Sequence, residues 1–294
     1  MSFRWSGKHL LIGLVLSAFV LFGLARYAGG NDHGDDLSSS FVGCRLLSEG
    51  SALQHLYSSD PTDFSAIGPD DAWQEAADRG GFAGYLHPYV QTPLWAYLLE
   101  PTCERLNFSQ FKTMFAVIML LSFAVTLWLV ARFWAPAFLH PLPLAIVAVA
   151  LTASQPFQYA MFLMQTHILF VLVTVAALIL AERERPAMAG LLLAFAAAVK
   201  VTPALLLLYW IITRRWKAAA YMAGWLALLT AISVFAGGTP LFRIYLEQLG
   251  RLSHTLLLSQ NNQSLAAWWM THFYPFDEVP VSYTHLTLPT KRIV

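Results

Sequence analysis

Long apolar runs recur along this chain, and they limit the folds open to it more than any other feature. Several of them approach the roughly 20 apolar residues that a helix needs to cross a bilayer. Apolar residues make up 57% of the 294 residues and charged residues only 12%, which is about half of the charged fraction usual in a soluble domain. The sequence therefore predicts an all-α polytopic membrane protein.

Seven runs are predicted to be membrane helices, and two of them are separated by an unusual break. The motif KVTP places Lys200 and Pro203 inside the apolar region 186–213, and proline both removes a helical hydrogen bond and clashes with the preceding turn. Two short helices, or one kinked helix turning near the lipid–water boundary, are expected there. The predicted spans are 9–27, 112–133, 142–162, 166–182, 186–200, 203–213 and 216–236.

The first run has the features of a signal peptide, because Arg4 and Lys8 precede it. The rest of the chain is membrane-embedded too, so we expect this run to remain as the first span. Residues 1–280 are then expected to form a single transmembrane domain.

The basic residues predict which ends of the spans face the cytoplasm. Lys and Arg gather in short cytoplasmic loops, and Arg4 and Lys8 place the N-terminus inside. Arg132 and the loops AERERP and TRRWK then also fall inside, provided that the segment 88–106 does not cross the membrane. This segment is short and interrupted by prolines, so we expect it to be re-entrant or to lie at the outer surface.

The same alternation makes residues 28–111 a long external loop, which we expect to carry short amphipathic helices. Polar residues that are unusual in a membrane protein gather on this outer side of a bacterial plasma membrane. They include Asp35, Asp36, Gln155, Gln158, Gln165, His167, Lys200 and the segment SQNNQS at 259–264. Ionisable groups at membrane depth are costly and usually functional, so this asymmetry predicts a site on the extracytoplasmic face.

Each of these residues also has a purely structural interpretation. Lys200 either extends its ammonium group to the membrane surface or binds a phosphate, and His167 either bonds to backbone at a helix start or contacts substrate. Asp35 and Asp36 either begin a helix near Leu37, where a carboxylate is stabilised electrostatically, or act in catalysis. The segment SQNNQS either caps the next helix or contacts substrate.

Metal binding and cysteine pairing are only weakly indicated by the sequence. No further carboxylate or histidine stands at recognisable ligand spacing from Asp35 and Asp36, so no metal or other cofactor is expected. Cys44 and Cys103 are both external on this topology, but sequence alone does not place them within reach of a disulfide.

The order of several motifs resembles a known enzyme family. The acidic pair after the first span is followed by YVQTPLWAYLLEP, QTHILF, KVTPALLLLYWIITRRWK and NNQSLAAW. In this order, over residues 9 to about 272, the chain resembles family 87 of the glycosyltransferases, which are polyprenyl-phosphate-sugar-dependent, mannosyltransferase-like membrane enzymes of the GT-C fold. The resemblance implies transfer of a mannose-like hexose, with inversion, to a hydroxyl of a lipid or glycan acceptor.

The resemblance also implies roles for individual residues. Asp36 matches the acidic residue that acts as catalytic base, with Asp35 as the alternative. The glycine and asparagine of a Gly-Gln-x-Asn pattern are replaced here by Met164 and His167, and Thr92 replaces a proline. The residues expected to bind substrate are Lys200, His167, Gln165, Gln91, Asn262 and Gln263.

The expected partners are membrane lipids, the polyprenyl-phosphate-linked sugar and the acceptor. The chain has no basic stripe of the kind that nucleic acid requires. Two other functions are compatible with the sequence: a transporter or flippase, whose broken helices line a substrate pathway, or an inactive member of the family.

The last residues, 281–294, differ from the rest of the chain. The segment VSYTHLTLPTKRIV resembles a translated sequencing adaptor, so we expect it to be a non-native tail. The parent protein is then expected to continue into further spans, and the loss of those spans can leave this shorter chain inactive.

Overall fold

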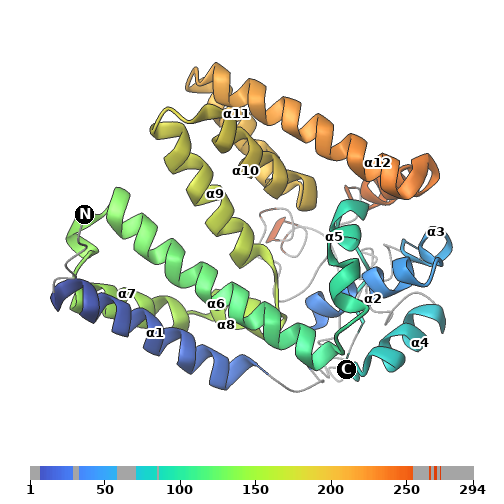
Figure 1. The fold of residues 1–294 in the computed structure, drawn as a ribbon, viewed down its shortest axis with the longest axis horizontal. Helices are drawn as coiled ribbons and strands as arrows, with labels where there is room; N and C mark the ends of the chain where they lie inside the picture. The colour runs from blue at the N-terminus through green and yellow to red at the C-terminus, as the bar shows by residue number, and fades with distance from the viewer. Residues whose placement is uncertain are drawn as a thin grey trace.

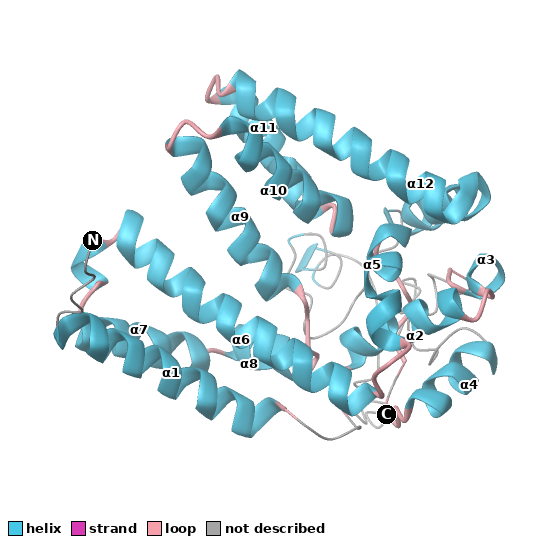
Figure 2. Cartoon of the chain, viewed as in Figure 1, coloured by secondary structure: helices cyan, strands magenta, loops and turns pink. Residues whose placement is uncertain are grey.

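The computed structural model describes residues 7–28, 33–57, 71–84 and 86–253, together with 265, 268, 269 and 272. Every regular element within these ranges is a helix (Figure 2), which confirms the prediction of an all-α membrane protein. The expected tail at 281–294 lies outside the described residues, and the extent of the domain stays a prediction.

Among the described residues, three helices are long and apolar enough to cross a bilayer. They are α1 (Gly7–Tyr27), α6 (Phe108–Phe133) and the part of α12 (Trp216–Ser253) that runs to Gly250. Much of their surface is apolar and exposed, as at Leu21, which is 67% exposed, and Phe235, which is 93% exposed. Such extensive apolar surface is suited to contact with lipid.

Helix α12 continues beyond the predicted span 216–236 because it passes through a kink. Gly238 has a φ of 75° and a ψ of 159°, and Pro240 follows two residues later. Glycine adopts this backbone conformation freely, and proline removes one hydrogen bond from the helix. The part after the kink places Leu241 and Tyr245 in the main hydrophobic core, which also contains residues from the segment between α1 and α6.

The predicted single span 142–162 differs from the structure, where it is divided in two. The short 3₁₀ helix η1 (Pro136–Phe138) precedes α7 (Pro141–Ala153), which meets α8 (Gln155–Phe162) at an angle of 63°. Ser154 between α7 and α8 has an extended backbone with a ψ of 140°. Pro156, in the first turn of α8, has no N–H to continue α7 and is well suited to begin a new helix.

Four short apolar elements follow, and their main break lies where the sequence predicted it. Lys200 has an extended backbone, with a φ of −132° and a ψ of 119°, and Pro203 stands in the first turn of the next element. The elements are α9 (His167–Glu182), α10 (Pro186–Val199), the 3₁₀ helix η2 (Thr202–Ala204) and α11 (Leu205–Ile212).

The bundle has two groups of packed helices (Figure 1). Helix α10 packs between α9 and α12, while α1 packs on α6 and α7. A Cβ on Gly190 of α10 would lie 2.7 Å from the backbone nitrogen of Met222 in α12. Small residues that allow two helices this close an approach are typical of membrane bundles.

The described helices between α1 and α6 form a layer at one end of the bundle, here called the outer layer (Figure 1). Helix α2 is buried almost all round, whereas α4 is amphipathic and buries one face through Trp73, Ala76 and Ala77. A disulfide between Cys44 and Cys103 joins α2 to α5, so the two cysteines do pair. The helices are α2 (Asp35–Ser48), α3 (Ala52–His55), α4 (Asp71–Gly80) and α5 (Pro93–Cys103).

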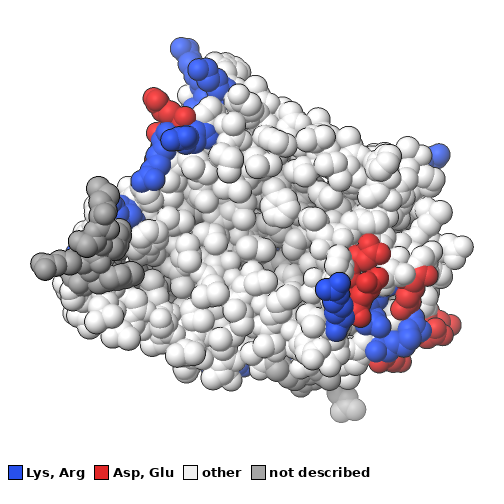
Figure 3. All heavy atoms as spheres, in the orientation of Figure 1, with Lys and Arg blue, Asp and Glu red and all other residues white. Residues whose placement is uncertain are grey.

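On the face that Figure 3 shows, charged side chains lie mainly at the two ends. On the face shown, a mostly basic group lies near the α9–α10 and α11–α12 connections, and a mixed group lies over the short outer helices. In α4, Arg79 pairs with Glu49, the residue after α2, at 2.7 Å and with Glu75 at 3.4 Å. The middle of this face is almost free of charge, as expected of a surface that contacts lipid.

Candidate functional site

Asp36 lies in the first turn of α2, where the outer layer meets the corner between α8 and α9. Gly34 enters the helix with a φ of 105°, and the Asp36 backbone N–H donates to the carbonyl of Leu163 at 3.1 Å. Gly34 also lies against the corner, because a Cβ there would be 3.2 Å from Cγ of Met164. Asp36 is therefore fixed relative to the bundle by its own backbone.

The chain turns from α8 to α9 at a residue with a left-handed backbone conformation. Met164 is fully buried and has a φ of 55°. Its N–H donates to Met161 at 3.2 Å, and the N–H of Gln165 donates to Ala160 at 2.8 Å, which is the hydrogen-bond pattern of a Schellman helix end. The position that matches a glycine in the family pattern is thus one where the backbone favours glycine.

Two side chains hold the carboxylate of Asp36. Gln165 Nε2 donates to Asp36 Oδ2 at 2.5 Å, and His87 Nδ1 lies 2.6 Å from Asp36 Oδ1. Since an ionised carboxylate only accepts hydrogen bonds, His87 Nδ1 must carry the hydrogen. The side chains of His87 and Asp36 are 25% and 30% exposed, so the group remains open to a ligand.

Two neighbouring groups in the outer layer have shifted pKa values. Burial raises the pKa of Asp35, and the negative charge of Asp36 adds to that rise, while His87, His33 and Lys112 oppose it. Burial alone would lower the pKa of His87. Its hydrogen bond to Asp36 and the charges of Asp36 and Asp35 outweigh burial, so the pKa of His87 is raised. An adjacent carboxylate favours the imidazolium form in this way.

His167 and Lys200 complete the group around Asp36. His167 is the first residue of α9, and Lys200 directly follows α10. Lys200 interacts electrostatically with both Asp36 and His167. The ends of two apolar helices therefore place a cation and an imidazole near the carboxylate.

Thr92 connects the outer layer to the end of α10. It precedes α5, whose first residue is Pro93, and its hydroxyl donates to the carbonyl of Ala198 at 2.5 Å. That carbonyl lies in the last turn of α10, where carbonyls have no partner within the helix. The carbonyl of the neighbouring Gln91 accepts a hydrogen bond from the Tyr57 hydroxyl at 2.7 Å.

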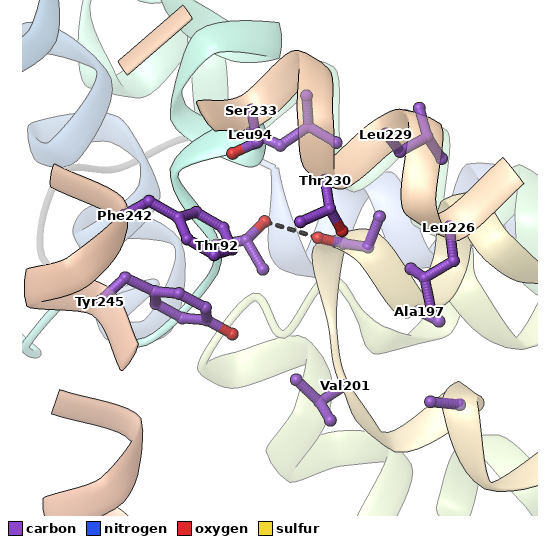
Figure 4. A pocket seen from close by; sticks show the side chains of 12 residues that line it. Thr92, Leu94, Ala197, Val201, Leu226, Leu229, Thr230, Ser233, Phe242 and Tyr245 are labelled. Atoms are coloured by element: carbon purple, nitrogen blue, oxygen red, sulfur yellow. Dashed lines mark hydrogen bonds between the residues drawn. The ribbon is translucent and has the colours of Figure 1, made fainter. Parts of the chain in front are cut away.

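A pocket of about 170 Å³ lies beside Lys200, between α10 and the two arms of the kinked α12 (Figure 4). Its walls are mostly apolar, and Phe242 and Tyr245 line it from the arm after the kink. Ser233, on the other arm, is 2% exposed, and its hydroxyl has no hydrogen-bond partner among the described residues. Val201, the residue after Lys200, also lines the pocket.

The structure brings together most of the residues that the sequence singled out. Asp36 and Gln165 are in direct contact, Asp35 is next to Asp36 in the sequence, and His167 and Lys200 interact electrostatically with Asp36. Gln91 lies one residue before Thr92, with its side-chain oxygen buried and unpartnered among the described residues. Asn262 and Gln263 lie outside the described residues.

Two titratable residues near this site were not predicted from the sequence. His87 precedes Pro88 in the outer segment, and only its place among polar residues of the external loop could have drawn attention to it. Lys112 is 4% exposed in the second turn of α6 and interacts electrostatically with Asp35. An ionisable residue at the start of an apolar run is a signal that the sequence did offer.

No group of three His, Cys, Asp or Glu side chains that could hold a metal ion occurs in the part of the chain that the structure describes. The chemistry available from the described residues is that of a carboxylate base, two imidazoles, a carboxamide and an ammonium group. Such a set can accept a proton and stabilise an anion.

Comparison with known proteins identifies the family of this chain. A model of glycosyltransferase family 87 matches residues 89–281, more than half of the chain. The chain belongs to glycosyltransferase family 87. It is a membrane glycosyltransferase, and the family 87 match includes Gln165, His167 and Lys200 but begins after Asp36 and His87. No curated protein and no solved structure matches the chain.

Proposed function

We propose that this family 87 enzyme transfers a mannose-like hexose from a polyprenyl phosphate to a hydroxyl group of a lipid or glycan acceptor. Asp36 is the general base in this proposal. It accepts the proton as the O–H bond of the acceptor breaks, the acceptor oxygen bonds to the anomeric carbon, and the sugar–phosphate bond breaks with its electrons leaving on the phosphate. Attack from the face opposite the phosphate inverts the anomeric centre.

The observation that carries this proposal is the position of Asp36. Its carboxylate is held by two donors, partly exposed, and close to the cation Lys200. A positioned carboxylate removes a proton in the transition state, while a nearby cation stabilises negative charge that develops on a leaving phosphate. The N-terminus of α9, which begins at His167, adds positive potential for the same anion.

The pocket beside Lys200 supports a lipid-linked donor. An apolar cavity of about 150 Å³ is large enough to hold benzene, and the pocket here has about 170 Å³. It therefore has room for the five carbons of one isoprene unit, the part of a polyprenyl chain next to the phosphate. We propose that this first unit occupies the pocket while Lys200 binds the phosphate.

We further propose that the site faces the extracytoplasmic side of a bacterial plasma membrane. The disulfide between Cys44 and Cys103 lies in the same outer layer as Asp36, and stable disulfides occur in oxidising compartments. Arg183, Arg185 and Arg214 lie at the opposite ends of their helices from His167 and Lys200. Basic loops of this kind face the cytoplasm.

The donor class can be tested with the purified full-length protein in liposomes. Radiolabelled hexose is supplied either on a polyprenyl phosphate or on a nucleotide, together with lipid acceptors, and covalent product is measured. We expect product from the polyprenyl donor alone, and Lys200→Gln should raise the KM for that donor. Product from the nucleotide sugar, or movement of the polyprenyl lipid across the bilayer with no covalent product, would refute the proposal.

A further inference from the structure

Resting on the proposed role of Asp36, we infer that His87 is a positioning residue for the base: it fixes the carboxylate through its Nδ1–H and must be uncharged for transfer to proceed. His87 comes from the outer segment between α4 and α5, outside both the family match and the set of residues singled out in the sequence. Its distance of 2.6 Å to Asp36 Oδ1 is the observation that carries this assignment.

Among the described residues, each carboxylate oxygen of Asp36 has one hydrogen-bond donor. His87 holds Oδ1 from the outer layer, and Gln165 holds Oδ2 from the corner between α8 and α9. Each oxygen has two lone-pair directions, so one direction on each remains for the acceptor hydroxyl. Two donors on opposite oxygens fix the plane of the carboxylate, which rotates readily when it has none.

The charge of His87 controls how basic Asp36 is. An uncharged imidazole donates one hydrogen bond, and Asp36 remains a competent base. A charged imidazolium places a full positive charge at the same distance and stabilises the ionised carboxylate. The carboxylate then takes up the acceptor proton less favourably. Transfer should therefore slow as the pH falls through the pKa of His87.

The direction of this pH effect follows from the charges that face the two residues. Asp35 and Asp36 of α2 raise the pKa of His87, so the midpoint of the loss should lie above the ordinary histidine value of about 6.5. Lys112 and His33 face Asp35, and His167 and Lys200 face Asp36. Burial also raises the pKa of Asp35.

The kinetic test uses three variants and the wild type, with donor transfer measured from pH 5 to 9. His87→Ala should lower kcat by about 10–100-fold with little change in KM, since a small misplacement of a reacting group has effects of this size. His87→Asn keeps an N–H donor and cannot become charged. It should therefore retain most of the wild-type kcat, and its transfer rate should not fall at acidic pH as that of the wild type does. His140→Ala, at an exposed position before α7, is the matched control.

A second test does not depend on activity. Histidine labelled with ¹⁵N reports whether Nδ1 carries a hydrogen, and the His87 signal is assigned by its loss in His87→Asn. We expect Nδ1 to carry a hydrogen throughout, Nε2 to titrate above the ordinary histidine range, and the pKa of His87 to be lower in Asp36→Asn. A His87 whose titration does not respond to Asp36→Asn would overturn the inference even if no donor gave product.

The two proposals fail in different ways. Suppose that the wild type transfers sugar, but His87→Ala keeps at least half of kcat or His87→Asn still loses activity at acidic pH. The assignment of His87 is then wrong and the proposed function stands. If the wild type gives no product with any polyprenyl donor, the proposed function fails, and the titration alone decides whether His87 is coupled to Asp36.

Discussion

At the scale of single residues, the site depends on backbone conformations that only a few side chains allow. Gly34 enters α2 with a φ of 105°, and Met164 turns the α8–α9 corner with a φ of 55°. The two residues touch, because a Cβ on Gly34 would lie 3.2 Å from Cγ of Met164. The position of Asp36 relative to Gln165 therefore depends on a glycine that faces a buried methionine.

Gly34→Ala should destabilise the protein by about 1–3 kcal/mol, the usual range for a residue held in a sparsely populated backbone conformation. It should also reduce transfer, because the strain lies two residues from Asp36. Gly50→Ala is the matched control: Gly50 has a φ of 74°, but a Cβ there would meet nothing within 4 Å. Thermal unfolding in detergent and the transfer assay measure both effects; equal loss of transfer in the two variants would contradict this account.

At the scale of helices, α10 and α12 approach each other closely at Gly190. The contact of α10 with α12 positions Lys200, which follows α10, and the pocket between these two helices. A Cβ at Gly190 would lie 2.7 Å from both the backbone nitrogen of Met222 and Cβ of Tyr221. Backbone cannot move aside as a flexible side chain can, so this contact tolerates little change.

Gly190→Ala should therefore destabilise the bundle, although alanine favours a helix by roughly 0.5–1 kcal/mol over glycine. Overpacking costs about 1–3 kcal/mol, and contact with backbone places this site in the upper part of that range. Gly224→Ala in α12 should be neutral or stabilising, since a Cβ there would meet nothing within 4 Å. Thermal unfolding compares the two; a Gly190→Ala variant as stable as Gly224→Ala would show that the helices do not approach so closely.

Some of the helices and breaks could be predicted from the sequence, and others could not. Apolar length predicted α1 and α6, and the KVTP motif predicted the break between α10 and α11, because proline and a charged residue leave strong local signals. The bend between α7 and α8 was missed although Gln155–Pro156 offered a signal, because the apolar residues on both sides are together long enough for one span. The packing of α2 against α5 through Cys44 and Cys103 is long-range, and no local pattern records it.

At the scale of the whole molecule, the site forms where segments distant in sequence meet at one end of the bundle. Asp36, Gln165 and Lys200 were singled out separately, on charge and on resemblance, and the fold brings them together. His87 could not be paired with Asp36 from sequence, because 51 residues separate them. The residues of a catalytic group can thus be proposed one by one, but their hydrogen bonds require the fold.

The most direct test of the account is sugar transfer by Asp36→Asn from a polyprenyl-phosphate donor. The amide keeps the size of the side chain but cannot act as a base, so kcat should fall by at least about 100-fold, with the protein still folded in the membrane. Asp71→Asn, which changes an exposed carboxylate in the first turn of α4, should transfer at the wild-type rate. Near-normal transfer by Asp36→Asn would contradict the assignment of Asp36 as the base and, with it, the mechanism proposed for this site.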